Sequence, residues 1–279
     1  MNEEQTRKVV REGYARIARE ANPCCAPKNS CCSKAEPAYE IGRHIGYTDE
    51  ELGEVPEGAN LGLGCGNPVA LASLKEGETV LDLGSGAGFD CFLAAGRVGE
   101  KGRVIGVDMT PEMLEKAREN AGKGSYTNIE FRLGEIENLP VADNHVDVVI
   151  SNCVINLSPD KKRVFAESFR VLKPGGRLMV SDIVLLKELP DSVKSSVQAY
   201  VGCLAGAIMK DDYIGAIRDS GFAEVTVVDE TCFPVQLMAD DPAAGAAIDK
   251  LSQSTDRGEG VTDSVVSLKV HAVKPNTAA

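Results

Sequence analysis

Three cysteines stand singly at points where a thiol could do chemistry. They are Cys65, Cys153 and Cys203. Glycines flank Cys65 in LGLGCGNP, Cys153 follows an apolar run, and a glycine precedes Cys203 in YVGCLAG. A lone cysteine usually serves as a small core residue, but thiols in a reducing compartment also bind soft metals or act in redox chemistry. Taken together, the three positions favour a functional site over packing.

A glycine-rich segment, VLDLGSGAGFD, lies at residues 80–90. It follows an expected strand and opens an expected helix, where Gly84, Gly86 and Gly88 would let the backbone approach a ligand closely. The G-x-G-x-G spacing differs from the G-x-G-x-x-G of pyrophosphate-binding loops. Asp82, in the strand just ahead, offers a carboxylate for an ammonium group. The segment therefore predicts a site for S-adenosylmethionine (SAM), which carries an amino-acid ammonium and no phosphate.

Residues that follow the next strands extend this predicted cofactor site. Asp108 ends the second strand, and an ionised carboxylate there can accept both hydroxyls of a ribose. NAD enzymes share this feature, so it is less specific than the glycine segment. We expect the adjacent Met109 and, at the end of the fourth strand, Asn152 to contact the cofactor. Glu135 would mark the adenine end, with Ile136 packing on the ring.

Alternating strands and helices must bring these side chains together. The expected strands are Thr79–Leu83, Arg103–Val107, Asn128–Arg132, Val146–Ser151, Arg177–Asp182, Ala223–Asp229 and Val265–Val273. The expected helices include residues 1–20, Phe89–Val98, a helix that opens at Pro111, and Asp160–Leu172, with a turn at Lys173–Gly176 and a helix around Cys203. Inner strands that are apolar at consecutive positions indicate a parallel sheet covered by helices on both faces. We therefore predict a doubly wound, Rossmann-like α/β fold.

Additions at both ends are expected to complete this fold. Residues 1–70 form an N-terminal extension with a cysteine-rich loop and, apart from a short helix near Thr48–Leu52, an irregular stretch from residue 38 onward. Residues 71–187 form the SAM-binding domain. Residues 188–279 form a C-terminal α+β addition that binds substrate, with a poorly patterned stretch at residues 234–262.

The end of the fourth strand bears on the acceptor, because ligands bind beyond the carboxyl ends of strands in such sheets. Methyl transfer to oxygen or nitrogen often needs a base, and the chain offers no histidine or acid between Cys153 and Asp160. Trivalent arsenic binds thiolates, as thiophilic metals do, and its lone pair can attack a methyl group without a base. Such chemistry depends on thiols that hold arsenic in line with the sulfonium. The three single cysteines therefore favour arsenite as the methyl acceptor.

Longer segments resemble known families. LDLGSGAGFD, VIGVDMTPEML and VLKPGGRLMVSD are similar to recurrent segments of SAM-dependent methyltransferases, from about Glu78 to Asp182. NLGLGCGNPVALASLKEGETVLDLGSGAGFDCFLAA, SNCVINLSPDK and GCLAGA resemble arsenite methyltransferases nearly residue for residue, from about Glu40 to Phe222. The resemblance implies that Cys153 and Cys203 hold arsenic and that Cys65 joins them or pairs with an N-terminal cysteine during turnover. It also implies that thioredoxin or another thiol reductant then restores the dithiol, in a role in arsenic detoxification.

The N-terminal partner of Cys65 is one of four candidates. They are Cys24, Cys25, Cys31 and Cys32. The family pattern is loose here, and we favour Cys32, with Cys31 second, from their place just before Glu36 and Pro37. A zinc site is a competing interpretation, although two cysteine pairs separated by five residues do not match the usual C-x₂₋₄-C spacing. Cys91 and Cys232 are expected to serve packing, and the scattered histidines have no metal-ligand spacing.

Composition narrows the possible partners. The net charge of −12 argues against nucleic acid and anionic membranes, since both select a basic face. No apolar run reaches the roughly 20 residues that span a bilayer, and the charged N-terminus does not resemble a secretory signal. We expect a cytoplasmic protein whose partners are a small-molecule substrate and a thiol reductant.

Two other functions stay open at this point. A methyltransferase for a small organic acceptor, such as a quinone-like ring, explains the cofactor site but leaves Cys65 and Cys203 without a role. A metalloid-binding sensor or sequestering protein explains the thiols but not an intact SAM loop.

Overall fold

The computed structural model describes residues 2–20, 37–124, 126–189, 191–194, 197–232 and 264–276. All four N-terminal candidate cysteines, and with them the competing zinc site, lie outside these ranges, as does the poorly patterned stretch 234–262. Within the described residues, no helix is both long and apolar enough to cross a bilayer.

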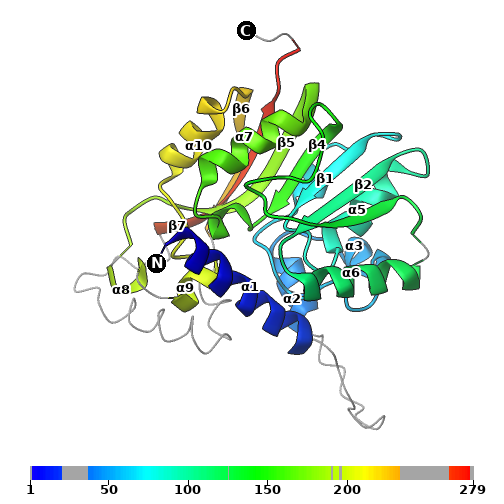
Figure 1. Cartoon of the computed structure of the whole chain (residues 1–279), viewed down its shortest axis with the longest axis horizontal. Coiled ribbons are helices and arrows are strands. Elements are labelled where there is room, and N and C mark those ends of the chain that lie inside the picture. Colours follow the sequence, from blue (N-terminus) through cyan, green and yellow to red (C-terminus); the bar gives the residue numbers. More distant parts are fainter. Residues whose placement is uncertain are drawn as a thin grey trace.

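A seven-stranded sheet forms the centre of the described structure (Figure 1). Its strands are β1 (Thr79–Leu83), β2 (Arg103–Asp108), β3 (Ile129–Leu133), β4 (Val146–Asn152), β5 (Leu172–Leu185), β6 (Ala223–Cys232) and β7 (Val265–Val273). Their order is β3-β2-β1-β4-β5-β7-β6. Neighbours among β1 to β5 are parallel, whereas β7 runs antiparallel to both β5 and β6. The predicted Rossmann-like α/β sheet is therefore confirmed, and strands from the predicted C-terminal addition complete it.

Helices cover both faces of the sheet. They are α1 (Glu3–Glu20), α2 (Pro37–His44), α3 (Asp49–Glu54), α4 (Pro68–Leu71), α5 (Phe89–Val98), α6 (Pro111–Gly124), α7 (Lys161–Val171), α8 (Asp191–Lys194), α9 (Val197–Val201) and α10 (Lys210–Asp219). Local sequence sets several ends: Thr48 and Glu51 form a capping box at α3, and the Asp160 side chain accepts from Arg163 N at the start of α7. Pro111 begins α6, where its missing N–H costs nothing.

Strand residues alternate between two hydrophobic clusters, one on each face. Leu81, Ile105 and Val149 pack in the cluster that α7 and α10 cover. Their neighbours Val80, Val104 and Val148 pack in the cluster that α5 and α6 cover. Because both faces are buried, successive positions must all be apolar, which explains the uninterrupted apolar runs.

Three local predictions differ from the structure. The expected helix around Cys203 is wrong, because α9 ends at Val201 and Cys203 has a φ of 66° in the following turn. The turn expected at Lys173–Gly176 lies within β5, where the β4–β5 register shifts between Val146 and Val148 and the extra residues bulge from the ladder. The stretch from residue 38 to 78 contains α2 and α4 besides the expected short helix.

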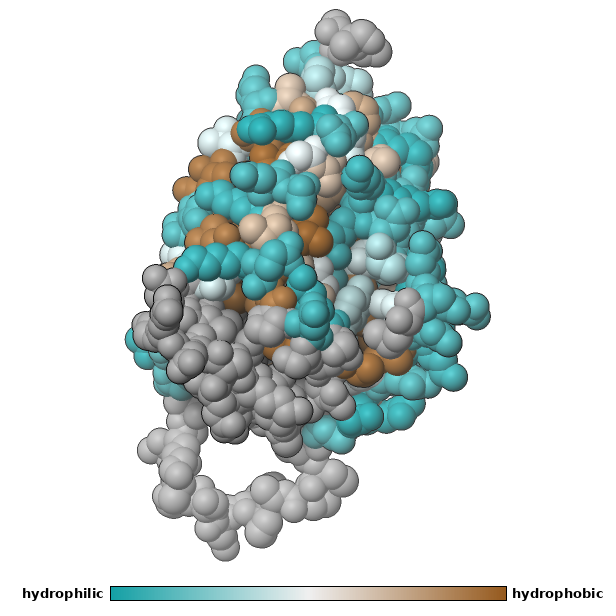
Figure 2. Space-filling view, turned by 90° about the vertical axis from the view of Figure 1, so that its left-hand side faces the viewer, coloured by the Kyte–Doolittle hydropathy of each residue, from teal (hydrophilic) through white to brown (hydrophobic). Residues whose placement is uncertain are grey.

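The face seen in Figure 2 mixes hydrophilic residues with small hydrophobic areas. Among the exposed large hydrophobic residues, Val227 and Val228 belong to β6, the strand at one edge of the sheet. The opposite edge is formed by β3. Between these edges lie β1, which leads into the glycine-rich segment, and β4, which ends at Asn152.

We predict that Gly206→Ala destabilises the fold. A Cβ at Gly206, in the turn after Cys203, would lie 2.1 Å from the backbone carbonyl oxygen of Asn156. Backbone must move to relieve this contact, so we expect a loss of about 1–3 kcal/mol in the free energy of unfolding. Gly96→Ala is the matched control: Gly96 lies exposed within α5 with no atom near its missing Cβ, so the change should stabilise by about 0.5–1 kcal/mol. Urea unfolding of both variants tests the contrast, and equal effects would contradict it.

Candidate active site

A cavity of about 470 Å³ opens at the carboxyl ends of the parallel strands. Its walls come from the glycine-rich loop after β1, from the ends of β2 and β4, and from the loop 59–64. Helix α1 crosses this end of the sheet (Figure 1) and contributes Arg7, Val10, Tyr14 and Ile17 to the wall. The site thus lies where α/β sheets of this kind bind ligands, under a helix far away in sequence.

The glycine-rich loop follows β1 with its glycines in left-handed conformations. Gly84 has a φ of 66°, and a Cβ there would lie 2.3 Å from the Val154 side chain. Gly86 has a φ of 52°, and nothing lies within 4 Å of where its Cβ would be. A side chain at Gly84 would therefore strike the loop after β4, whereas the open space at Gly86 is part of the cavity.

Asp108 anchors this loop. Its Oδ2 accepts from Gly86 N at 2.9 Å, and its Oδ1 accepts from Thr110 N at 2.8 Å. The carboxyl is buried, which raises its pKa, while these backbone N–H groups act in the opposite direction. Each oxygen keeps a further lone pair, so Asp108 can accept hydroxyl groups from a ligand in the cavity.

Two further carboxyls line the cavity close to each other. Burial is the main cause that raises the pKa of Asp90 to about 6 and the pKa of Asp82 well above its ordinary value. Asp90 accepts from the Tyr47 hydroxyl at 2.6 Å, and Asp82 accepts from the Cys91 thiol at 3.2 Å. Among the described ion pairs, none involves either carboxyl. Two buried acids without a cation fit a positively charged ligand group.

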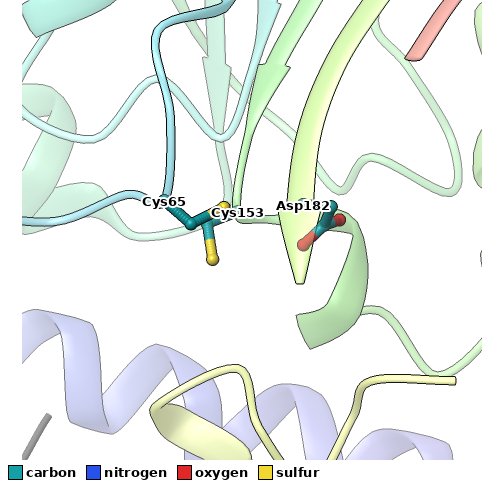
Figure 3. A group of neighbouring side chains, drawn as sticks. All are labelled: Cys65, Cys153 and Asp182. Carbon is teal, nitrogen blue, oxygen red and sulfur yellow. The ribbon is translucent and has the colours of Figure 1, made fainter. Parts of the chain in front are cut away.

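The first two single cysteines meet at the end of β4. Figure 3 shows Cys65 beside Cys153, with Asp182 on the neighbouring β5. The two Sγ atoms and a carboxylate oxygen of Asp182 all lie within 4.8 Å of one another. Cys153 has a φ of 58°, and its N–H donates to Ser181 O at 2.8 Å. The turn after β4 therefore places the Cys153 thiol beside the Cys65 loop.

The third cysteine approaches from the turn after α9. The Cys203 thiol donates to Cys153 O at 2.9 Å and lies 3.9 Å from the Tyr14 hydroxyl. All three cysteines are buried in one hydrophobic cluster, which also contains Val10 of α1. Hydrogen bonding to Cys203 and to Cys65, together with burial, raises the pKa of Cys153 well above its usual range. Burial also raises the pKa of the Cys65 thiol.

Asp182 is the acidic member of this cluster and was missed in the sequence. It is fully buried and accepts from Asn156 Nδ2 at 2.7 Å, from Ile183 N at 3.0 Å and from the Tyr213 hydroxyl at 3.1 Å. Burial raises its pKa to about 7, although the Ile183 N–H and the Lys161 ammonium partly offset this. Its place as the last residue of the expected strand Arg177–Asp182 was a usable signal, because the carboxyl ends of parallel strands share one edge.

Most of the predicted site residues line the cavity. Those that do are Asp82, Gly84, Gly86, Asp108, Met109, Ile136, Asn152, Cys153 and Cys203. Gly88 and Cys65 are not part of this lining. Glu135 also lies outside it, with its carboxylate 3.5 Å from Arg7 and 3.9 Å from Arg11, and Glu137 lines the cavity instead. Tyr14, Tyr47 and Asp90 line or support the site and were not singled out from the sequence.

Known proteins match this chain over most of its length. Residues 74–221 match the family described as a methyltransferase domain, and the chain belongs to that family. It is 52% identical over 231 residues to an arsenite methyltransferase of Halobacterium salinarum, which covers 80% of this chain and 59% of that protein. Human arsenite methyltransferase is 36% identical over 219 residues, or 75% of this chain and 56% of that protein. The chain spans less than two thirds of the length of these curated relatives.

A solved structure shares the fold over most of the chain. CrArsM, an arsenic(III) S-adenosylmethionine methyltransferase from Chlamydomonas reinhardtii, superposes with a TM-score of 0.64 at 35% identity. The match covers 86% of this chain and 75% of CrArsM. A ubiquinone/menaquinone biosynthesis C-methyltransferase of Francisella tularensis is 34% identical over 140 residues, which is 48% of this chain and 56% of that protein.

The buried Asp182 predicts a distinct pH dependence of stability. Its pKa of about 7 exceeds the ordinary value of 3.8, so this group's contribution is fully present below pH 3.8 and is lost by the time the pH has passed 7. In the wild type this group should lower the free energy of unfolding by at most about 1.4 kcal/mol per pH unit. Asp182→Asn should remove that slope, so the stability of the variant relative to the wild type should rise between pH 5 and 7. Thermal unfolding at stepped pH measures this, with Asp143→Asn, at an exposed carboxylate, as the control. Parallel pH profiles for wild type and Asp182→Asn would refute it.

Proposed function

We propose that this chain transfers methyl groups from SAM to thiol-bound trivalent arsenic. The observation that carries the proposal is the convergence of three buried thiols at the end of β4, beside a cavity built for a cationic nucleoside-like ligand. The arsenite methyltransferase relatives and CrArsM support the same reaction.

The cavity residues suit SAM group by group. Asp82 and Asp90 would hold the ammonium, Asp108 the ribose hydroxyls, and Ile136 and Met109 the adenine. When bound, SAM supplies an electrophilic methyl group on a sulfonium. The chain's own residues bind and orient the ligand and keep water from the acceptor, and the open space at Gly86 accommodates it.

The thiols suit arsenite because they are neutral. The raised pKa values of Cys153 and Cys65 keep both thiols protonated in the free protein. Arsenous acid is also neutral. Each exchange forms one As–S bond and breaks one As–OH bond, and the thiol proton leaves with the hydroxyl group as a water molecule. No net charge is buried at any stage, which a hydrophobic cluster requires. Two As–S bonds, to Cys153 and Cys203, would fix the arsenic lone pair in direction.

Redox turnover would involve the remaining thiols. Methylation of the lone pair raises arsenic from the trivalent to the pentavalent state, and two thiols can return the two electrons by forming a disulfide. Cys65, with Cys32 or Cys31 as its partner, is proposed for this step. Thioredoxin or another thiol reductant would restore the dithiol. A cytoplasmic location, where thiols stay reduced, belongs to this proposal.

The test is incubation of the protein with SAM, arsenite and a thiol reductant, followed by arsenic speciation. Cys153→Ser and Cys203→Ser should each abolish methylation of arsenite and of methylarsenite while SAM affinity survives. The double variant should be little worse than either single one, because the two thiols act as one unit. Cys232→Ser, at an exposed cysteine on β6, is the matched control and should keep activity. Near-normal activity of either single variant on methylarsenite would exclude the two-thiol mechanism, and full activity on an organic acceptor with none on arsenite would favour the rival function.

Asp108 tests the cofactor assignment separately. Asp108→Ala should weaken SAM binding strongly, because it removes the acceptor for two hydroxyls and the anchor of Gly86 N. Asp108→Asn keeps one acceptor oxygen and should lose less affinity than Asp108→Ala. The expected loss in Asp108→Asn is about 1–3 kcal/mol of binding free energy, the range for hydrogen bonds to charged groups. Calorimetric titration with SAM measures both. Unchanged affinity in Asp108→Ala would end the ribose assignment.

A further inference from the structure

Asn152 lies between the proposed cofactor carboxyls and the loop that carries Cys65. It is the last residue of β4 and directly precedes Cys153. Its Oδ1 accepts from Cys65 N at 3.0 Å, and its Nδ2 lies 2.8 Å from Gly66 O. These two bonds hold the peptide groups on either side of the Cys65 thiol, so the position of Cys65 follows the orientation of one amide.

The same amide also reaches the cofactor side. Nδ2 lies 3.1 Å from Asp90 Oδ2 and 2.9 Å from the Tyr47 hydroxyl oxygen. Tyr47 donates its own hydrogen to Asp90 Oδ1 at 2.6 Å, so toward Asn152 it acts as an acceptor. Nδ2 therefore faces three acceptors but carries only two hydrogens. The relative strengths of the three acceptors determine the orientation of the amide group.

Ionisation of Asp90 sets that balance. A carboxylate accepts more strongly than a phenol oxygen, so an ionised Asp90 and the Gly66 carbonyl together hold the two hydrogens and leave Oδ1 aimed at Cys65 N. A cation bound beside Asp82 and Asp90 favours the ionised carboxylate, whereas burial of the carboxyl disfavours it. Occupation of the cofactor site would thus tighten the amide clamp on the Cys65 loop.

The loop has little room to respond in another way. A Cβ at Gly64 would lie 2.8 Å from Asn152 Nδ2, and one at Gly66 would lie 1.9 Å from Ser181 Oγ. Ser267 Oγ of β7 donates to Cys65 O at 2.6 Å. Because the loop is packed closely on Asn152, a reoriented amide changes the placement of Cys65.

We infer that Asn152 is a positioning residue that couples occupation of the cofactor's ammonium site to the placement of Cys65. The Cys65 Sγ lies within 4.8 Å of the Cys153 Sγ and can join Cys153 and Cys203 in binding arsenic before its redox step, so that cofactor and trivalent arsenic bind with positive cooperativity. This inference rests on the proposed function. Coupling between two ligands is reciprocal, so arsenic must raise cofactor affinity by the same factor.

Calorimetry without turnover tests the coupling. Arsenite is titrated into the full chain in a phosphine reductant, with and without saturating S-adenosylhomocysteine, which has the ammonium but no methyl to transfer. The dissociation constant of arsenite should fall by about five-fold or more in the wild type, within the usual range for coupled sites. Asn152→Ala should bind both ligands but reduce the factor to below about two-fold.

Two further variants separate coupling from general damage. Asp90→Asn leaves the Asn152 contacts with Cys65 and Gly66 in place and should also lose the coupling. Ser267→Ala is the matched control, because Ser267 Oγ holds the same loop through Cys65 O but does not line the cofactor cavity; its coupling should match the wild type. Thermal unfolding checks that each variant is folded.

Each outcome decides the inference. A wild-type factor below about two-fold, or a wild-type factor retained in either Asn152→Ala or Asp90→Asn, overturns it while leaving the proposed function intact. A wild type that binds S-adenosylhomocysteine but not arsenite overturns the proposed function and the inference with it.

Discussion

The site depends on the parallel alignment of β1, β2, β4 and β5, which brings the carboxyl ends of these strands to one edge. Strands β1, β2 and β4 each carry a cavity residue at or near the carboxyl end, namely Asp82, Asp108 and Asn152. β5 continues past the last residue of β4, which pairs with Ser181, and so places Asp182 beside the thiols. Antiparallel neighbours would have sent these side chains to opposite ends of the sheet.

Burial of ionisable groups without matching charges is the second feature of the site. The pKa values of Cys65, Cys153, Asp82, Asp90 and Asp182 are all raised, with burial among the causes. Such groups cost stability when ionised, and the cost falls when a cation or a thiophilic centre binds. The buried thiols and the pair Asp82 and Asp90 therefore suit the thiophilic centre and the cationic group of the proposed ligands.

Elements far apart in the chain enclose this site. Helix α1 supplies Tyr14, whose hydroxyl approaches Cys203, and β7 supplies Ser267, which holds the Cys65 carbonyl. The close approach of α1 to α9 is visible at Gly13, where a Cβ would lie 2.9 Å from the Val201 side chain. The N-terminal helix thus belongs to the wall of the site, together with the turn that carries a candidate arsenic ligand.

Local sequence was sufficient for the seven strands and for Asp82, Asp108 and Asn152 at or near strand ends, although Asp182 was missed. The consecutive apolar runs at β1 and β4 predicted buried parallel strands, and the G-x-G-x-G spacing after Asp82 placed a ligand loop, because both patterns arise within a few residues. Contacts between distant segments carry no such pattern. Tertiary structure decided four such features. They are the approach of Tyr14 to Cys203, the Tyr47–Asp90 hydrogen bond, the proximity of the Cys65 and Cys153 thiols, and the left-handed turn at Cys203 in place of a helix. The physical reason is that residue type and spacing determine which face of an element is buried, whereas packing of the whole chain determines what that face meets.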